Sequence, residues 1–112
     1  MTLSFGSVIF YYYLCSMKKS KLKQYSYYSD HGRDKGTQYF IMASSQKQVV
    51  ELFNSIGRNI TLGYVRDYVY QAWGNDGEEA MKDIEITEAC IYVVKREGMF
   101  SKITETPKKV TE

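Results

Sequence analysis

The side chains best suited to bind a ligand lie between Tyr64 and Asn75. Tyr64 and Tyr68 stand four positions apart, so on a helix their rings fall one turn apart on the same side. A planar base can stack on one ring, while Arg66 neutralises a phosphate and Asn75 hydrogen-bonds a base edge or a ribose. These residue types favour a nucleotide site, for which there are three further candidates: Trp73, Lys95 and Arg96.

The sequence predicts no catalytic residue, metal ligand or cofactor. Its single histidine is His31, and its two cysteines, Cys15 and Cys90, lie far apart without the spacing of a zinc site. A glycine-rich phosphate loop and a nucleophile elbow are both missing from the sequence. We therefore expect a binding protein that is not an enzyme, with both thiols reduced.

Composition limits the class of partner. The 112 residues carry 15 basic and 13 acidic side chains, a net charge of +2 that argues against coating nucleic acid. A chain of this size has a large surface for its volume, so self-association would stabilise it. The 11 tyrosines suit a binding or oligomeric surface, although a tyrosine-rich sheet face explains them equally well.

Residues 1–16 form an extension of doubtful status before a single domain at residues 17–103. Their apolar run precedes the lysines that begin at Lys18, whereas a signal peptide has its charges first. The run is also shorter than the roughly 20 residues that span a bilayer. We expect no membrane role and a cytoplasmic location in a host cell, with an interfacial anchor as the alternative. Residues 104–112 are polar and predict a disordered tail.

Periodicity predicts an α+β fold. Alternating residues at 24–29 and 37–43 indicate a β-hairpin with a seven-residue polar loop. Ser45 and Gln48 have the spacing that opens a helix, and Gly57 is typical of its end. A second helix is expected from Asn59 or Thr61 to about Gly74, before a turn at 75–77 and a short acidic helix at 78–83.

The C-terminal half completes the expected sheet. Residues 89–95 are continuous and rich in β-branched side chains, which predicts a central strand. Residues 99–103 follow Gly98 and predict an edge strand. The whole chain then reads as two or three helices covering one face of an antiparallel sheet, with a hairpin first and a strand or hairpin last.

Two helices joined around Gly57 also suit a helix-turn-helix, which is the DNA-binding alternative. Phe53 stands where close helix crossing usually needs a small residue, and Arg58 and Arg66 are the only basic residues nearby. Because phosphate contacts dominate affinity for DNA, two arginines supply little of it.

A resemblance to a known family rests on three segments: residues 43–47 opening a helix, the stretch Tyr64-Val65-Arg66-Asp67-Tyr68, and Trp73-Gly74-Asn75 before an acidic helix. Over residues 24–100 the pattern resembles small phage proteins that counter bacterial defence, specifically the first family of Thoeris anti-defence proteins, which are sponges for cyclic ADP-ribose isomers. The resemblance implies a homo-oligomer that encloses a nucleotide signal without cleaving it. It also implies that Tyr64 stacks, Arg66 is a nearby cation, Asn75 makes a polar contact and Arg96 binds phosphate.

The resulting hypothesis is a non-catalytic protein that sequesters a nucleotide-derived immune signal, such as a cyclic ADP-ribose isomer or a cyclic oligonucleotide, and so blocks bacterial anti-phage defence. It requires Tyr64, Arg66 and Asn75 to converge on a closed pocket. A DNA-binding regulator, or a phage inhibitor that binds a host defence protein directly, remains the alternative.

Overall fold

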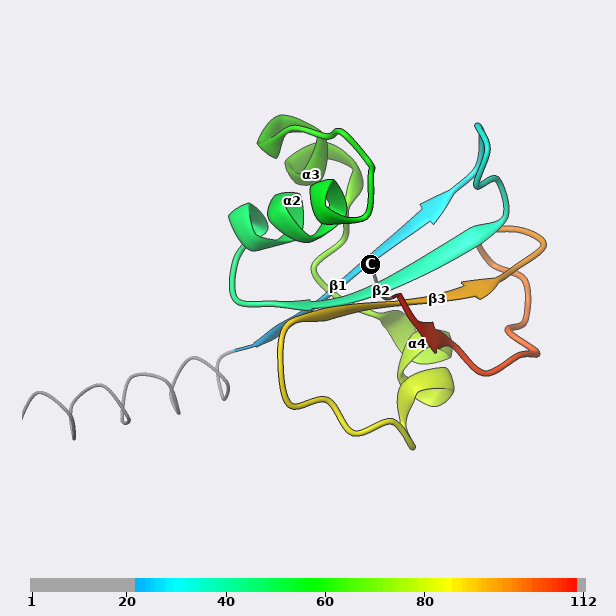
Figure 1. Ribbon diagram of the computed structural model, residues 1–112. Coiled ribbons are helices and arrows are strands. Elements are labelled where there is room, and N and C mark those ends of the chain that lie inside the picture. Colours follow the sequence, from blue (N-terminus) through cyan, green and yellow to red (C-terminus); the bar gives the residue numbers. More distant parts are fainter. Residues whose placement is uncertain (1–21, 111–112) are drawn as a thin grey trace, which may run out of the picture.

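Helices lie on both faces of a four-stranded antiparallel sheet in the computed structural model, which describes residues 22–110 (Figure 1). The sheet has the order β1-β2-β3-β4, with β1 at Lys23–Ser29, β2 at Thr37–Ala43, β3 at Cys90–Lys95 and β4 at Lys108–Lys109. The helices are α2 (Gln46–Ser55), α3 (Leu62–Tyr68) and α4 (Gly74–Met81). The expected α+β class is confirmed. The expected extension at residues 1–16 lies outside the described residues.

The predicted hairpin is confirmed, and its register determines what each face of the sheet carries. Tyr25 pairs with Ile41, and Ile41 pairs in turn with Ile91, so these side chains share one face. Tyr27 and Tyr39 pair on the same face, where the Phe53 ring of α2 packs edge-on against both at 6.0 and 5.3 Å. This face forms the larger core, under α2 and α3.

The predicted ends of α2 are also confirmed. Ser45 Oγ accepts a hydrogen bond from the Gln48 backbone N–H at 3.2 Å, while the Gln48 side chain accepts one from the backbone of Ser44. At the other end Gly57 has φ of +93°, a conformation that glycine adopts without a Cβ clash. The next backbone N–H, from Arg58, then reaches back to the Phe53 carbonyl at 2.9 Å.

The second helix is shorter than the sequence predicts, and the expectation that it runs to Gly74 is wrong. Thr61 caps it as expected, but Val69 is already extended, with φ of −105° and ψ of 121°. Tyr70 then exchanges two backbone hydrogen bonds with Ser26, of 2.8 and 2.9 Å, at the edge of β1. The open edge of β1 competes with the helix for these backbone groups, and the chain crosses there to the other face of the sheet.

Residues 74–77 begin α4 and do not form the expected turn, so the acidic helix starts earlier than predicted. Met81 of α4 and the preceding Trp73 join Phe40 and Val94 in a second core cluster. Phe40 and Val94 lie on the sheet face opposite to α2 and α3, because they alternate with Tyr39 and Val93. The prediction that the helices cover only one face is therefore wrong.

The final strand also differs from its prediction. Residues 99–103 form a turn and loop in which Phe100 is 90% exposed, whereas the two residues of β4 lie in the segment expected to be disordered. Lys109 pairs with Tyr92, and the Val110 backbone N–H donates to the Ile91 carbonyl at 2.9 Å. Pairing with β3 therefore supplies order that the polar composition does not indicate.

Substitution of Gly77 by alanine is expected to destabilise the fold by about 1–2 kcal/mol. A Cβ at this position would lie 2.6 Å from Phe40 Cε1 and 2.8 Å from Trp73 Cβ, and the cost of overpacking exceeds the gain in helix propensity. Urea denaturation measures the loss. Gly98→Ala is the matched control, because its added Cβ would meet no atom within 4 Å. Equal stability of the two variants would contradict this packing.

Candidate functional site

A groove of about 520 Å³ lies on the α4 face of the sheet. The strands supply its floor through Ser26, Tyr28 and Gln38, with Arg96 directly after β3. One wall is the segment from Tyr70 to Asp76, and the other is the loop that carries Met99 and Phe100. The volume lies within the roughly 300–1,000 Å³ of ordinary small-molecule sites.

Aromatic rings make up much of the groove. Tyr70 is 64% exposed and Phe100 is 90% exposed, so both rings present free surface, and Tyr28 is half-buried beside them. Trp73 lies deeper and packs edge-on against Phe40, with the ring centroids 5.9 Å apart. Exposed rings of this kind can stack on any planar base, because every base has an aromatic face.

Arg96 is held rigidly at the groove by three different partners. Its Nε donates to the Ser101 carbonyl at 2.9 Å, its Nη1 to Gln38 Oε1 at 3.0 Å, and its Nη2 to Asp76 Oδ2 at 2.8 Å. The Arg96 side chain is only 7% exposed. The sheet, the 97–101 loop and α4 therefore meet at one guanidinium.

The N-terminus of α4 opens onto the same groove. Trp73 occupies the N-cap position, and its side chain makes no capping hydrogen bond. Gly74 and Asn75, the first residues of the helix, line the groove. Free backbone N–H groups and the helix dipole favour an anion here. The carboxylate of Asp76, in the first turn, supplies part of that negative charge.

The structure divides the residues singled out by the sequence between two faces of the sheet. Trp73, Asn75 and Arg96 line the groove together. A second group lies on α3, across the sheet, and comprises Tyr64, Arg66 and Tyr68. The expected convergence of Tyr64, Arg66 and Asn75 on one closed pocket thus does not occur within one chain, because α3 ends before the chain crosses the β1 edge.

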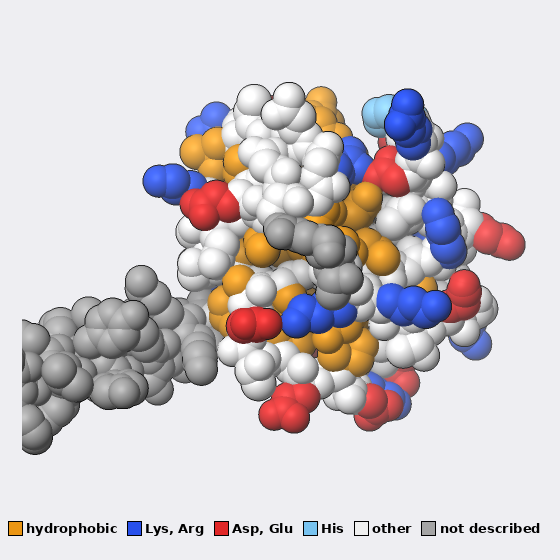
Figure 2. Space-filling model, in the orientation of Figure 1, with side chains coloured by type: hydrophobic (Ala, Val, Ile, Leu, Met, Phe, Trp, Pro, Cys, Tyr) orange, Lys and Arg blue, Asp and Glu red, His pale blue; other side chains and the backbone are white. Residues whose placement is uncertain are grey.

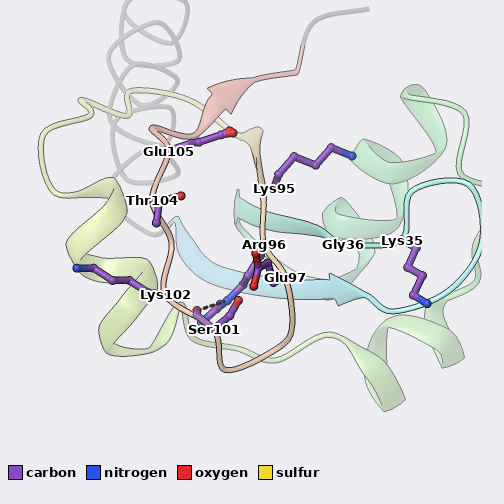
Figure 3. Close-up of a pocket in the computed structure, with 9 residues that line it drawn as sticks. All are labelled: Lys35, Gly36, Lys95, Arg96, Glu97, Ser101, Lys102, Thr104 and Glu105. Carbon is purple, nitrogen blue, oxygen red and sulfur yellow. Dashed lines mark hydrogen bonds between the residues drawn. The ribbon is translucent and has the colours of Figure 1, made fainter.

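Lys95 lies outside the groove as well. It lines a separate cavity of about 460 Å³ between the 97–105 loop and Lys35 (Figure 3). Figure 3 shows the ammonium groups of Lys35, Lys95 and Lys102 pointing in different directions. The Lys95 ammonium contacts Thr37 Oγ1 at 3.3 Å. These lysines do not converge on a common anion position.

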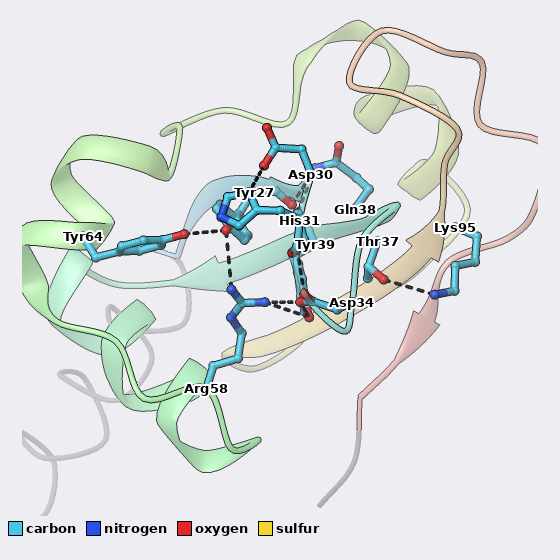
Figure 4. A network of polar contacts seen from close by, with 11 residues as sticks. Tyr27, Asp30, His31, Asp34, Thr37, Gln38, Tyr39, Arg58, Tyr64 and Lys95 are labelled. Atoms are coloured by element: carbon cyan, nitrogen blue, oxygen red, sulfur yellow. Dashed lines mark hydrogen bonds and ion pairs between the residues drawn. The ribbon is translucent and has the colours of Figure 1, made fainter.

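Tyr64 takes part in a polar network on the α2/α3 face (Figure 4). Its hydroxyl and that of Tyr27 share a hydrogen bond of 2.5 Å, and its ring lies 4.7 Å from the Tyr68 ring. Burial and this hydrogen bond together raise the pKa of Tyr27. Tyr64 therefore ties α3 to the sheet.

Arg58 and Asp34 form the charged part of this network. The Arg58 guanidinium pairs with Asp34 and lies 5.1 and 5.6 Å from the centres of the Tyr27 and Tyr39 rings. Burial acts to raise the pKa of Asp34, but hydrogen bonds donated by Tyr39 and Ser29 and the charge of Arg58 outweigh it, so the pKa lies below its usual value. This ion pair joins the β1–β2 loop to the end of α2.

These contacts bear on the DNA-binding alternative. Of the two arginines near the expected helix pair, Arg58 is engaged by Asp34, and Arg66 is exposed next to the acidic Asp67. Figure 2 shows lysine and arginine side chains spread over this view of the molecule, at the end of the sheet where β1 passes into β2 as well as on the side of α2 and α3. The helix that would read DNA, α3, carries one basic residue, Arg66, and one acidic residue, Asp67, so it offers no net positive charge to a phosphate backbone.

Sequence reasoning missed Tyr28, Gln38, Tyr70 and Phe100. The alternation within β1 and β2 could have found the first two, because Tyr28 and Gln38 form a pair on the face opposite to Tyr27 and Tyr39. No local signal indicated Tyr70, which reaches the groove only through its bridge to Ser26.

Comparisons with protein-family models, with curated proteins and with solved structures found no match to this chain. Within residues 22–110, no helix is both long enough and apolar enough to cross a membrane. The same part of the chain holds no cluster of three or more histidine, cysteine, aspartate or glutamate side chains that could bind a metal ion.

Asp34→Asn is expected to lower the free energy of unfolding at pH 7 by about 2 kcal/mol, because the neutral amide leaves Arg58 without its charged partner. The folded pKa of Asp34 lies below its unfolded value, so this stabilisation is present above about pH 4 and is lost as the pH falls through the folded pKa. Urea titrations between about pH 7 and pH 2 should show the wild-type advantage shrinking with acid.

The exposed Asp30, which contacts His31 on the same loop, provides the control. Asp30→Asn should leave stability nearly unchanged at every pH. An Asp34→Asn deficit that stays constant down to pH 2 would contradict the assigned pKa direction.

Proposed function

We propose that this protein is a non-catalytic binding protein that sequesters a nucleotide-derived signal, such as a cyclic ADP-ribose isomer or a cyclic oligonucleotide, and thereby blocks a bacterial anti-phage defence in the host cytoplasm. The observation that carries the proposal is the groove on the α4 face, where exposed aromatic rings stand beside Asn75, Arg96 and the uncapped start of α4.

Each part of a nucleotide has a matching group in the groove. The rings of Tyr70 and Phe100 offer stacking surfaces for a base. The Asn75 amide can donate and accept hydrogen bonds with a base edge or a ribose. A phosphate suits Arg96 and the backbone N–H groups at the start of α4. This combination supports a nucleotide better than an uncharged apolar ligand.

Sequestration requires the ligand to be enclosed, and the groove of one chain is open along the side of Tyr70, Met99 and Phe100. Their exposed fractions of 64%, 40% and 90% are large for apolar side chains that stand together. In our proposal a second copy of the chain covers this side, which makes the working form a homo-oligomer.

The first experiment incubates the protein with cyclic ADP-ribose isomers and cyclic dinucleotides and follows its melting temperature. A binder of the native state raises that temperature by mass action, and heat denaturation should then release the ligand chemically intact. A ligand recovered in cleaved form would replace the sponge with an enzyme. If no nucleotide shifts the melting temperature, the exposed Met99 and Phe100 instead favour a host defence protein as the partner.

A pair of tyrosines then locates the site. Tyr70→Ala removes a ring from the groove and should weaken binding of the shifting nucleotide about tenfold or more, as measured by calorimetry. Tyr68→Ala removes a ring that is 58% exposed on α3, and it should bind as the wild type does. The reverse result would place the ligand on the α3 face, against the groove.

A further inference from the structure

Arg96 and Asp76 form an ion pair whose two members differ sharply in exposure. The Arg96 side chain is 7% exposed, whereas the Asp76 side chain is 59% exposed. A buried guanidinium must keep a partner, because an unpaired buried charge is strongly unfavourable. An exposed carboxylate has no such need, since water can solvate it fully. Asp76 is therefore the replaceable member of the pair.

The remaining contacts of Arg96 keep its position independent of Asp76. Its Nε and Nη1 are held by the Ser101 carbonyl and by Gln38 Oε1, at 2.9 and 3.0 Å. Gln38 is itself buried and donates from its Nε2 to the Tyr27 and Tyr39 carbonyls, both at 3.1 Å. If Asp76 moved away, Nη2 would still point toward the groove with the same geometry.

We propose that Asp76 is an internal stand-in for the anionic group of the ligand, and that a phosphate or pyrophosphate oxygen displaces it from Arg96 Nη2. This inference rests on the proposed function, because it names how the same groove receives the anionic part of its ligand. On binding, the ligand oxygen takes the hydrogen bond from Nη2, and the Asp76 carboxylate turns into water. No covalent bond changes.

The exchange lets the groove accept an anion without leaving Arg96 unpaired. An anionic ligand can supply the negative charge that Arg96 loses when Asp76 leaves, whereas a neutral nucleoside cannot. A neutral ligand therefore binds with the Asp76 pair intact and gains only stacking and amide contacts. The carboxylate of Asp76 also repels a phosphate that approaches the start of α4, so its presence weakens binding of every anion there.

The test compares ADP-ribose with adenosine, which share a base and a ribose and differ in the pyrophosphate. Asp76→Asn keeps the size of the side chain and leaves a neutral acceptor that a phosphate displaces more easily. Calorimetry should show ADP-ribose binding this variant about fivefold more tightly than the wild type. Adenosine should bind both proteins equally.

Glu78→Gln is the matched control, because Glu78 is an exposed carboxylate on the same helix that does not contact Arg96. It removes the same charge from α4, so it should change the affinity for ADP-ribose far less than Asp76→Asn does. In the wild-type protein, the NMR signal of the Arg96 Nη2–H group should shift with ADP-ribose and stay in place with adenosine. This measurement does not depend on how well the variants fold.

The outcomes separate this inference from the proposed function. If both compounds bind but Asp76→Asn leaves ADP-ribose unchanged or weaker, the exchange is overturned while the groove remains a nucleotide site. An equal gain for Glu78→Gln, or an unmoved Arg96 signal with ADP-ribose bound, also overturns it. If neither compound binds the wild type or the variant, both claims are overturned: the exchange at Arg96, and the proposal that the groove binds adenine nucleotides.

Discussion

Two backbone hydrogen bonds between Ser26 and Tyr70 fasten the segment after α3 to the open edge of β1. They follow the end of α3 at Tyr68 and carry the chain from one face of the sheet to the other. Trp73 and α4 then reach Phe40 on the far face, and the groove forms between this segment and the loop after β3. Without the crossing, the residues of the groove would not share a face.

Two arginines join the elements of the fold, one on each face of the sheet. On the α2/α3 face, Arg58 ties the β1–β2 loop to the end of α2 through Asp34 and the surrounding tyrosines. On the α4 face, Arg96 ties the end of β3 to Gln38 and to α4. The first pair is shielded on both sides, with side-chain exposures of 25% and 27%, so it suits a structural role. In the second pair the Asp76 carboxylate is exposed, so a ligand anion can replace it beside Arg96.

The tyrosines illustrate why composition alone does not locate a site. Tyr25, Tyr27 and Tyr39 are buried in the core beneath α2 and α3, whereas Tyr28 and Tyr70 line the groove. Tyr27 and Tyr28 are neighbours in sequence, yet the pleat of β1 directs them to opposite faces of the sheet. One residue type therefore serves as packing on one face and as a candidate binding surface on the other.

Local sequence by itself determined the hairpin, the capped α2, its stop at Gly57 and the central position of β3, because each depends on backbone preferences or alternation within a few residues. It also identified Trp73, Asn75 and Arg96, which the fold brings together. Only the tertiary structure decided where α3 ends, which face α4 covers, and that Tyr64, Arg66 and Tyr68 lie across the sheet from the groove. The physical reason is that the contact between Ser26 and Tyr70 joins positions 44 residues apart, and no local preference encodes it.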